Sequence, residues 1–160
     1  MVKPLPGRHW ARIDGDFVVF LIGARFDLRH PVRTLQDLGG RRGMKYMLDE
    51  LMKQPDKGLL SYEFGLPTIV QYWRSFDHLE RFASDPDDPH AAAWRNYWKR
   101  VGSSNRSGIW HETYLVRAGE YEAVYANMPP FGLAKAGRME PLGKDVSARD
   151  RLRARVAARS

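Results

Sequence analysis

The run DFVVFLIGARF, residues 16–26, constrains the fold most strongly because it is apolar on both of its alternate faces. Its β-branched and aromatic residues favour a strand, in which successive side chains point to opposite faces. Phe17, Val19 and Leu21 lie on one face, and Val18, Phe20 and Ile22 lie on the other. A strand of this kind must lie between two covering layers.

The segments that follow alternate between helix-type and strand-type periodicity, and their order indicates an α+β fold. A β-α-β-β-α-β order with one added strand is typical of the ferredoxin-like, split βαβ arrangement, in which helices cover only one face of the sheet. A second copy of the chain is the economical cover for the other face, and it would give a homodimeric α+β barrel. The segments are helical residues 30–55, strands 59–65 and 68–75, a two-part helical region 75–102, and strands 109–116 and 118–128.

The chain length of 160 residues fits one domain with a sizeable core. We expect a single α+β domain over residues 1–137, with an irregular stretch after residue 128, and a basic tail or short helix over residues 138–160. The tail holds seven basic and three acidic residues, more than half of the net charge of +7. Because the excess charge is concentrated in an appendage, it indicates a solvated tail, and no nucleic-acid partner is expected.

The absence of cysteine excludes disulfides, zinc–thiolate sites and thiolate nucleophiles. No apolar run approaches the roughly 18 residues of a membrane span, and the start of the chain lacks the apolar core of a signal peptide. We therefore expect a cytoplasmic protein without a membrane partner. The aspartates of residues 85–88 precede a helical pattern, so capping explains them better than a metal site, and no metal is expected.

The strand GIWHETYLV, residues 108–116, places two ionisable groups side by side. Because strand side chains alternate, His111 and Glu112 point to opposite faces and cannot form an acid–base pair. We expect His111 and Thr113 on the side of a cavity, where a histidine suits general-base work. Glu112 would then need a partner on the helix side or at a contact between chains. A purely structural role for His111 stays open.

Several segments together resemble a known enzyme superfamily. TIVQYWRSFDHLERFASDPDDPH is similar to the central region of the antibiotic-biosynthesis-type monooxygenases. VVFLIGARFD, GIWHETYLV and EYEAVYANMPPFGLAKAG resemble a branch related to the fumagillin-pathway monooxygenase, so the likeness extends over residues 8–138. The resemblance implies a dimeric α+β barrel. The resemblance constrains the function less than the fold, because the superfamily also includes haem degraders, haem-dependent dehydratases and isomerases.

The resemblance also implies that Gln71 and Trp73 face the cavity. Gln71 would then offer hydrogen bonds to a substrate, and Trp73 would orient it by stacking. Packing in the core is the alternative for Trp73. Arg25 alternates with Gly23 near the end of its strand, which suggests a cation beside open space, although Arg25 could equally reach solvent.

The segment YANMPPFG follows the last strand pattern and is too rigid and apolar for a random tail. We interpret it as a rim over the cavity or as a strap between subunits, with Tyr125 and Phe131 as substrate contacts. Asn127 shares the strand face of Tyr125 and could hold a substrate oxygen or a peroxide.

The leading hypothesis is an oxygenase-type enzyme, a cofactor-independent monooxygenase, that acts on a flat apolar molecule such as an aromatic or terpenoid metabolite. His111 would remove a proton, the carbanion would reduce dioxygen directly, and Arg25 or Asn127 would stabilise the developing oxyanion. No flavin or nicotinamide motif occurs. The first alternative is a haem-binding degrader or dehydratase with His90 or His111 as the iron ligand. The second is a non-catalytic dimer that binds small molecules.

Overall fold

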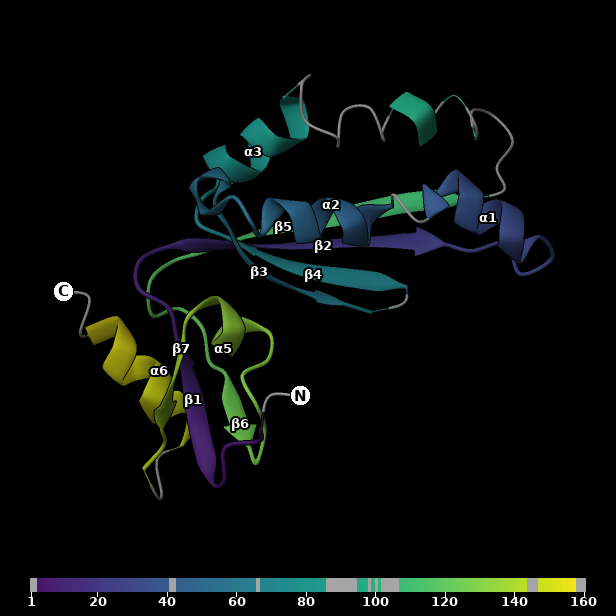
Figure 1. Ribbon diagram of the computed structural model, residues 1–160. Coiled ribbons are helices and arrows are strands. Elements are labelled where there is room, and N and C mark those ends of the chain that lie inside the picture. Colours follow the sequence, from purple (N-terminus) through teal and green to yellow (C-terminus); the bar gives the residue numbers. More distant parts are fainter. Residues whose placement is uncertain are drawn as a thin grey trace.

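The structure of the chain is a computed structural model that describes residues 3–40, 43–65, 67–85, 95–97, 99, 101, 107–143 and 147–157. It contains a four-stranded sheet with helices on one face and a smaller three-stranded sheet on the other side (Figure 1). The strands are β1 (Arg8–Arg12), β2 (Phe17–Arg25), β3 (Leu59–Phe64), β4 (Thr68–Trp73), β5 (Gly108–Val116), β6 (Val124–Ala126) and β7 (Arg138–Pro141). The helices are α1 (Pro31–Asp37), α2 (Met44–Leu51), the 3₁₀ turn η2 (Pro55–Lys57), α3 (Phe76–Ser84), α5 (Leu133–Ala136) and α6 (Ala148–Ala157).

The larger sheet has the strand order β3-β4-β2-β5, and all neighbours are antiparallel. Strands β2 and β3, which are joined through α1 and α2, are therefore parallel with β4 between them. Strands β4 and β5 are likewise parallel with β2 between them. Two interleaved βαβ units of this kind define the ferredoxin-like arrangement, so the α+β class expected from the segment order is confirmed.

The helices form where the sequence supplies both a start signal and an apolar stripe. Ser75 is the N-cap of α3, and its Oγ accepts a hydrogen bond from the backbone N–H of His78 at 3.3 Å. Leu79 and Phe82, three residues apart, are then buried against the sheet. Helix α1 begins with Pro31, a residue whose fixed φ suits the first helical turn.

The alternation of β2 divides the interior into two cores. Val18 belongs to the core between the helices and the sheet, with Leu48 of α2, Ile69 of β4 and Phe82 of α3. Phe17 belongs to a second core on the opposite face, where Ala11 of β1 and Leu133 and Ala134 of α5 cover it. The two covering layers predicted for this strand are present, although at this end the second layer comes from the same chain.

The three-stranded sheet, ordered β6-β1-β7, was not predicted. The added strand expected at residues 118–128 is shorter, covers Val124–Ala126, and pairs with β1 instead of joining the larger sheet. The stretch expected to be irregular, residues 129–144, contains α5 and all of β7, and β7 pairs with the opposite edge of β1. These strands have three to five residues, too few for a period-2 pattern to stand out.

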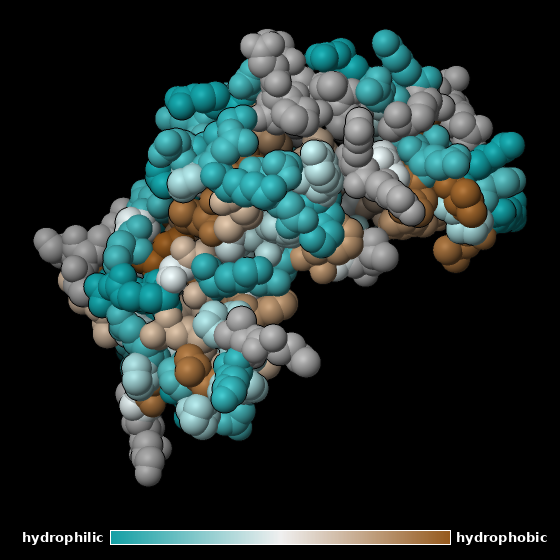
Figure 2. Space-filling view, viewed as in Figure 1, coloured by the Kyte–Doolittle hydropathy of each residue, from teal (hydrophilic) through white to brown (hydrophobic). Residues whose placement is uncertain are grey.

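Part of the second face of the larger sheet is not covered by any of the described residues. Trp110 and Tyr114 of β5 are 40% and 50% exposed there. Trp110 lies against Gly23, where an added Cβ would approach its indole ring within 2.6 Å. The molecular outline is hollowed beneath this part of the sheet (Figure 2). Leu21 and Val70 are only partly buried, so the open surface combines aliphatic and aromatic side chains.

Among the described residues, none of the helices has both the length and the hydropathy that a membrane crossing requires.

Candidate functional site

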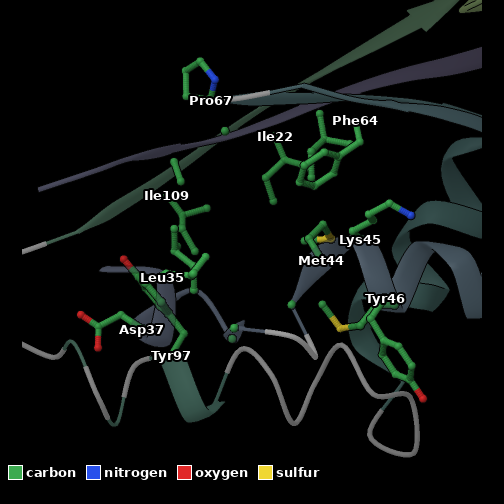
Figure 3. A pocket seen from close by; sticks show the side chains of 18 of the residues that line it. Ile22, Leu35, Asp37, Met44, Lys45, Tyr46, Phe64, Pro67, Tyr97 and Ile109 are labelled. Carbon is green, nitrogen blue, oxygen red and sulfur yellow. The ribbon is translucent and has the colours of Figure 1, made fainter. Parts of the chain in front are cut away.

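A cavity of about 200 Å³ lies between the helical layer and the end of the larger sheet. Ile22, Phe64 and Ile109 project from the strands toward Leu35 and Met44 of the helical layer (Figure 3). Hydrophobic residues gather at the end of the molecule where α1 lies (Figure 2). A mostly apolar wall with few polar groups is the usual composition of a small-molecule site.

Glycines between α1 and α2 shape the floor of this cavity. Gly39 and Gly40 have positive φ angles of 97° and 53°, a backbone region that favours glycine, and they reverse the chain between the helices. Gly43, the N-cap residue of α2, is buried. All three line the cavity, so backbone atoms instead of side chains form this part of the cavity wall.

The cavity wall contains few polar groups. Asp37, the last residue of α1, is only 6% exposed. The Tyr97 hydroxyl donates a hydrogen bond to the backbone oxygen of Ser107 at 3.4 Å. At the rim, Lys45 donates to Oδ2 of Asp49 at 2.7 Å, and this contact raises the pKa of Lys45 and lowers that of Asp49. Asp37 is therefore the carboxyl group that lines the cavity among the described residues.

His111 lies on β5 beside the cavity. It is paired with Ile22 across the strands and shares the face of Ile109, and both of these neighbours line the cavity. Residues two apart on one strand face are separated by roughly 6.6 Å. The imidazole is exposed and lies against the ring of Phe20, with ring centroids 5.5 Å apart. Thr113 is the next residue on the same face and is paired with Phe20.

The face that carries His111, Gln71 and Trp73 is covered by the helices, which corrects the predicted placement. These residues were expected on the side opposite the helices, in a space between two sheets. Trp73 instead has no exposed surface and packs against Phe82 of α3, with centroids 5.3 Å apart. Its Nε1 donates to Oε1 of Gln71 at 2.9 Å. The stacking role predicted for Trp73 has no support from this geometry, and the core alternative fits it.

Gln71 is buried to 1% exposure, and its Nε2 has no hydrogen-bond partner among the described residues. An unsatisfied buried amide of this kind costs stability unless a water or a ligand accepts from it. Gln71 and Thr113 are the cross-strand partners of Phe20 on its two sides. The amide therefore lies on the same face as His111, one strand beyond β2.

Arg25 and Asn127 are not brought together with His111. Arg25 is at the end of β2 on the face opposite the helices and is exposed. Asn127 follows β6 in the smaller sheet, with a φ of 52°. Its Oδ1 accepts from the backbone N–H of Gly7 at 2.9 Å, and its own N–H donates to the Gly7 oxygen at 3.0 Å. In this geometry Asn127 fastens the amino-terminal segment to the smaller sheet.

Tyr125 and Phe131 belong to the layer that covers the second face of the larger sheet. The Tyr125 hydroxyl accepts from the N–H of Ala134 at 3.2 Å, and burial raises the pKa of Tyr125. The N–H of Gly132 donates to Oε1 of Glu63 at 2.9 Å. These bonds hold the segment after Met128 to the sheet, while Phe131 stays half exposed. Neither predicted substrate contact lines the cavity described above.

Glu112 has a partner on its own strand. The Tyr114 hydroxyl donates to Oε2 of Glu112 at 2.5 Å, and this bond raises the pKa of Tyr114. Both side chains lie on the exposed face away from the helices. Of the two partners expected for Glu112, the one on the helix side is wrong, because Glu112 lies on the face away from the helices. A contact between chains stays a prediction.

His90 lies outside the described residues, so its predicted role as a haem ligand stays a prediction. Across the parts of the chain that the structure describes, no three His, Asp or Glu side chains gather closely enough to hold a metal ion.

The cavity residues Leu35, Met44, Phe64 and Ile109 were not predicted as a site. For Leu35 and Met44 the signal was the Met- and Leu-rich helical periodicity interrupted by glycines, whereas Phe64 and Ile109 belong to strand patterns. That pattern equally describes an ordinary core face.

The chain is similar to one protein family, to one relative within it and to two solved structures. The model of a family described as "Monooxygenase af470-like" matches residues 17–133. Monooxygenase af470 of Aspergillus fumigatus is 25% identical over 134 residues, which cover 76% of this chain and 46% of that protein. Crystal structures of two aldoxime dehydratases, one of them OxdRE with butyraldoxime, superpose with TM-scores of 0.46 at 15% and 16% identity. They cover 84% and 86% of this chain and 44% of each dehydratase chain. The chain thus spans less than half the length of these relatives.

Proposed function

Because the chain belongs to the monooxygenase af470-like family, we propose that it is a monooxygenase-type enzyme whose flat, apolar substrate binds in the cavity between α1, α2 and the larger sheet. The supporting observation is the apolar cavity itself, beside which β5 presents His111 on the same face as the cavity wall. The resemblance inferred from the sequence is confirmed at the level of the family. The substrate and the site residues are proposals.

The size of the cavity favours a compact ligand. Its volume of about 200 Å³ is below the roughly 300–1,000 Å³ of typical small-molecule sites. One or two fused rings, or a small terpenoid, suit this space better than a large polycycle. The apolar wall excludes water and so strengthens the electrostatic interactions of a reacting group.

The proposed chemistry uses dioxygen as the co-substrate. His111 would take a proton from an activated CH₂ group of the substrate, and the resulting carbanion would transfer electrons to dioxygen. Oxidation of that CH₂ group to a carbonyl supplies all four electrons required. One oxygen atom then forms the carbonyl and the other leaves as water, so the reaction balances without an external reductant. Gln71 has an amide N–H without a partner among the described residues, but it is buried and does not line the cavity, so no contact with the substrate is proposed for it.

The proposal is tested with a variant whose larger side chain fills the cavity. Ala24, a cavity-lining residue of β2, is changed in Ala24→Phe, and Ala83→Phe at an exposed position of α3 is the control. Binding of a panel of small phenols and terpenoid alcohols is measured by calorimetry, and turnover by oxygen uptake. Ala24→Phe should weaken binding about tenfold or more, because a ring displaced from the cavity forfeits over 1.4 kcal/mol of burial.

Equal binding by the two variants would place the substrate elsewhere. A Soret absorption band in protein expressed with haem available would instead favour the haem alternative. Saturable binding without oxygen uptake for any compound would favour the non-catalytic binding dimer.

We also propose that the uncovered sheet face, with Trp110 and Tyr114, contacts a second copy of the chain. The face is apolar and aromatic, and its carboxylate Glu112 is already hydrogen bonded by Tyr114. Sedimentation should give twice the chain mass of 18.4 kDa. Trp110→Glu should shift the protein to monomer, whereas Phe76→Glu on the helical side should not. A monomeric wild type would refute this assignment.

A further inference from the structure

A second concave site lies in the part of the molecule built around the smaller sheet. It is a groove of about 730 Å³ between α6, β1, β7 and the turns near Gly15 and Gly119. Strands β1 and β7 and helix α6 fall outside residues 17–133, which the family model matches. The groove is therefore formed largely by residues outside the matched region, and it is separate from the cavity described above.

Arg155 of α6 is fixed in the wall of this groove. Its guanidinium carbon lies 3.9 Å from the ring centroid of Trp10 and 4.7 Å from that of Tyr121. One terminal nitrogen donates to the Tyr121 backbone oxygen at 3.1 Å, and the other donates to the Ala11 oxygen at 2.9 Å. A guanidinium has five N–H donors, so three of them remain beyond these two bonds.

The charge of Arg155 is not compensated by an ion pair with any described residue. The other arginines of the groove differ, because Arg12 pairs with Asp14 at 3.5 Å and Arg151 donates from its Nε to Glu122 at 3.0 Å. The carboxylate of Glu122 reaches Arg155 only from beyond ion-pair distance. Burial lowers the pKa of Arg155. This effect is larger than that of the nearby carboxylates, which raise the pKa. A partly buried cation without a counter-ion is energetically unfavourable.

The remaining walls combine apolar surface with the charged side chains of Arg12, Asp14, Glu140 and Arg151, which are engaged in ion pairs. Trp10 and Tyr121 present aromatic rings, and Ile13 and Leu142 add aliphatic side chains. Helix α6 buries none of its own residues, so the groove beneath it is not filled by a hydrophobic stripe of the helix. A carboxylate with an attached ring would match both the cation and the walls.

We propose that this groove binds a small organic carboxylate, with the charged group at Arg155 and the apolar body against the groove wall. Binding would also strengthen the attachment of α6, which the described contacts tie to the smaller sheet mainly through Arg151 and Arg155.

The test uses benzoate as the probe, with benzyl alcohol as its neutral analogue and inorganic phosphate as an anion without a ring. In full-length ¹⁵N-labelled protein, benzoate should shift the Nε–H signal of Arg155 and the indole N–H signal of Trp10 saturably. Arg155→Gln should weaken benzoate binding about tenfold or more, as loss of a charge-assisted hydrogen bond predicts. Arg153→Gln, an exposed position on the same helix, should bind like the wild type.

A second variant separates ligand binding from the docking of α6. Ile13→Trp fills the groove and keeps Arg155, so it should lose benzoate binding. The NMR signals of Arg155 and Trp10 should still show that α6 is packed against the smaller sheet. The proposal is overturned if benzoate gives no saturable shift, or if Arg155→Gln or Ile13→Trp binds it like the wild type. It is also overturned if benzyl alcohol or phosphate binds as tightly as benzoate.

Discussion

Replacing Trp73 by alanine should lower the free energy of unfolding by about 3–5 kcal/mol. Trp73 has no exposed surface and packs in the core between the sheet and the helices. The substitution leaves a large cavity, and it also removes the donor that satisfies Oε1 of Gln71. An unsatisfied buried acceptor adds about 1–3 kcal/mol to such a loss. Urea unfolding followed by circular dichroism measures the effect.

Phe76→Ala is the matched control because Phe76, three residues along the chain, is 44% exposed. Its loss should stay within about 0.5 kcal/mol, as for most surface changes. The comparison also separates the two interpretations that the sequence left open for Trp73. A variant with unchanged stability and impaired ligand binding would show that Trp73 contacts a substrate after all.

The order of the larger sheet could be predicted from local patterns because each of its strands has six to nine residues. Alternation also separated Phe17 from Val18 correctly, and each residue belongs to a different core. Alternation cannot say which face the helices cover. Gln71 was expected on the other face because of the resemblance, and His111 because a histidine suits general-base work in a cavity. The structure places them there, with Gln71 bonded to Trp73 and His111 at the uncovered edge of β5.

The smaller sheet escaped prediction for a different reason. Trp10 of β1 is paired with Val124 on one side and Glu140 on the other, both more than a hundred residues away. Contacts over such distances leave no trace in local periodicity. Gly137 shows how closely the chains approach at this sheet, because an added Cβ would lie 2.1 Å from the Arg12 backbone oxygen. In the sequence this residue is simply one glycine of an apparent loop.

The predicted site was assembled from residues that are separated in space. Arg25, Asn127 and Tyr125 were linked to His111 through the expectation of a barrel lined by one face of every strand. The structure distributes them over the far face of β2 and the smaller sheet. What survives as a candidate site is the helix-covered face with its cavity, which depends on the turn of Gly39 and Gly40 between two helices.

His111→Ala should reduce turnover by about 10²–10⁴-fold, the usual contribution of a general base. The imidazole lies on the cavity-side face of β5 and is exposed, so its removal should leave stability nearly unchanged. His30→Ala is the matched control, since His30 is an exposed histidine at the start of α1 that pairs with Asp27 and does not line the cavity. Oxygen uptake with a compound that binds in the cavity measures both variants.

Addition of free imidazole distinguishes a proton acceptor from a positioning residue. If His111 removes the substrate proton, imidazole should restore part of the activity of His111→Ala, because the truncated side chain leaves room for a small base beside Ile22 and Ile109. Substrate affinity should change little, since these apolar residues make the cavity wall. A rate that is unaffected by the substitution would contradict the assignment. The proton acceptor would then have to be sought at Asp37, the buried carboxyl group of the same cavity.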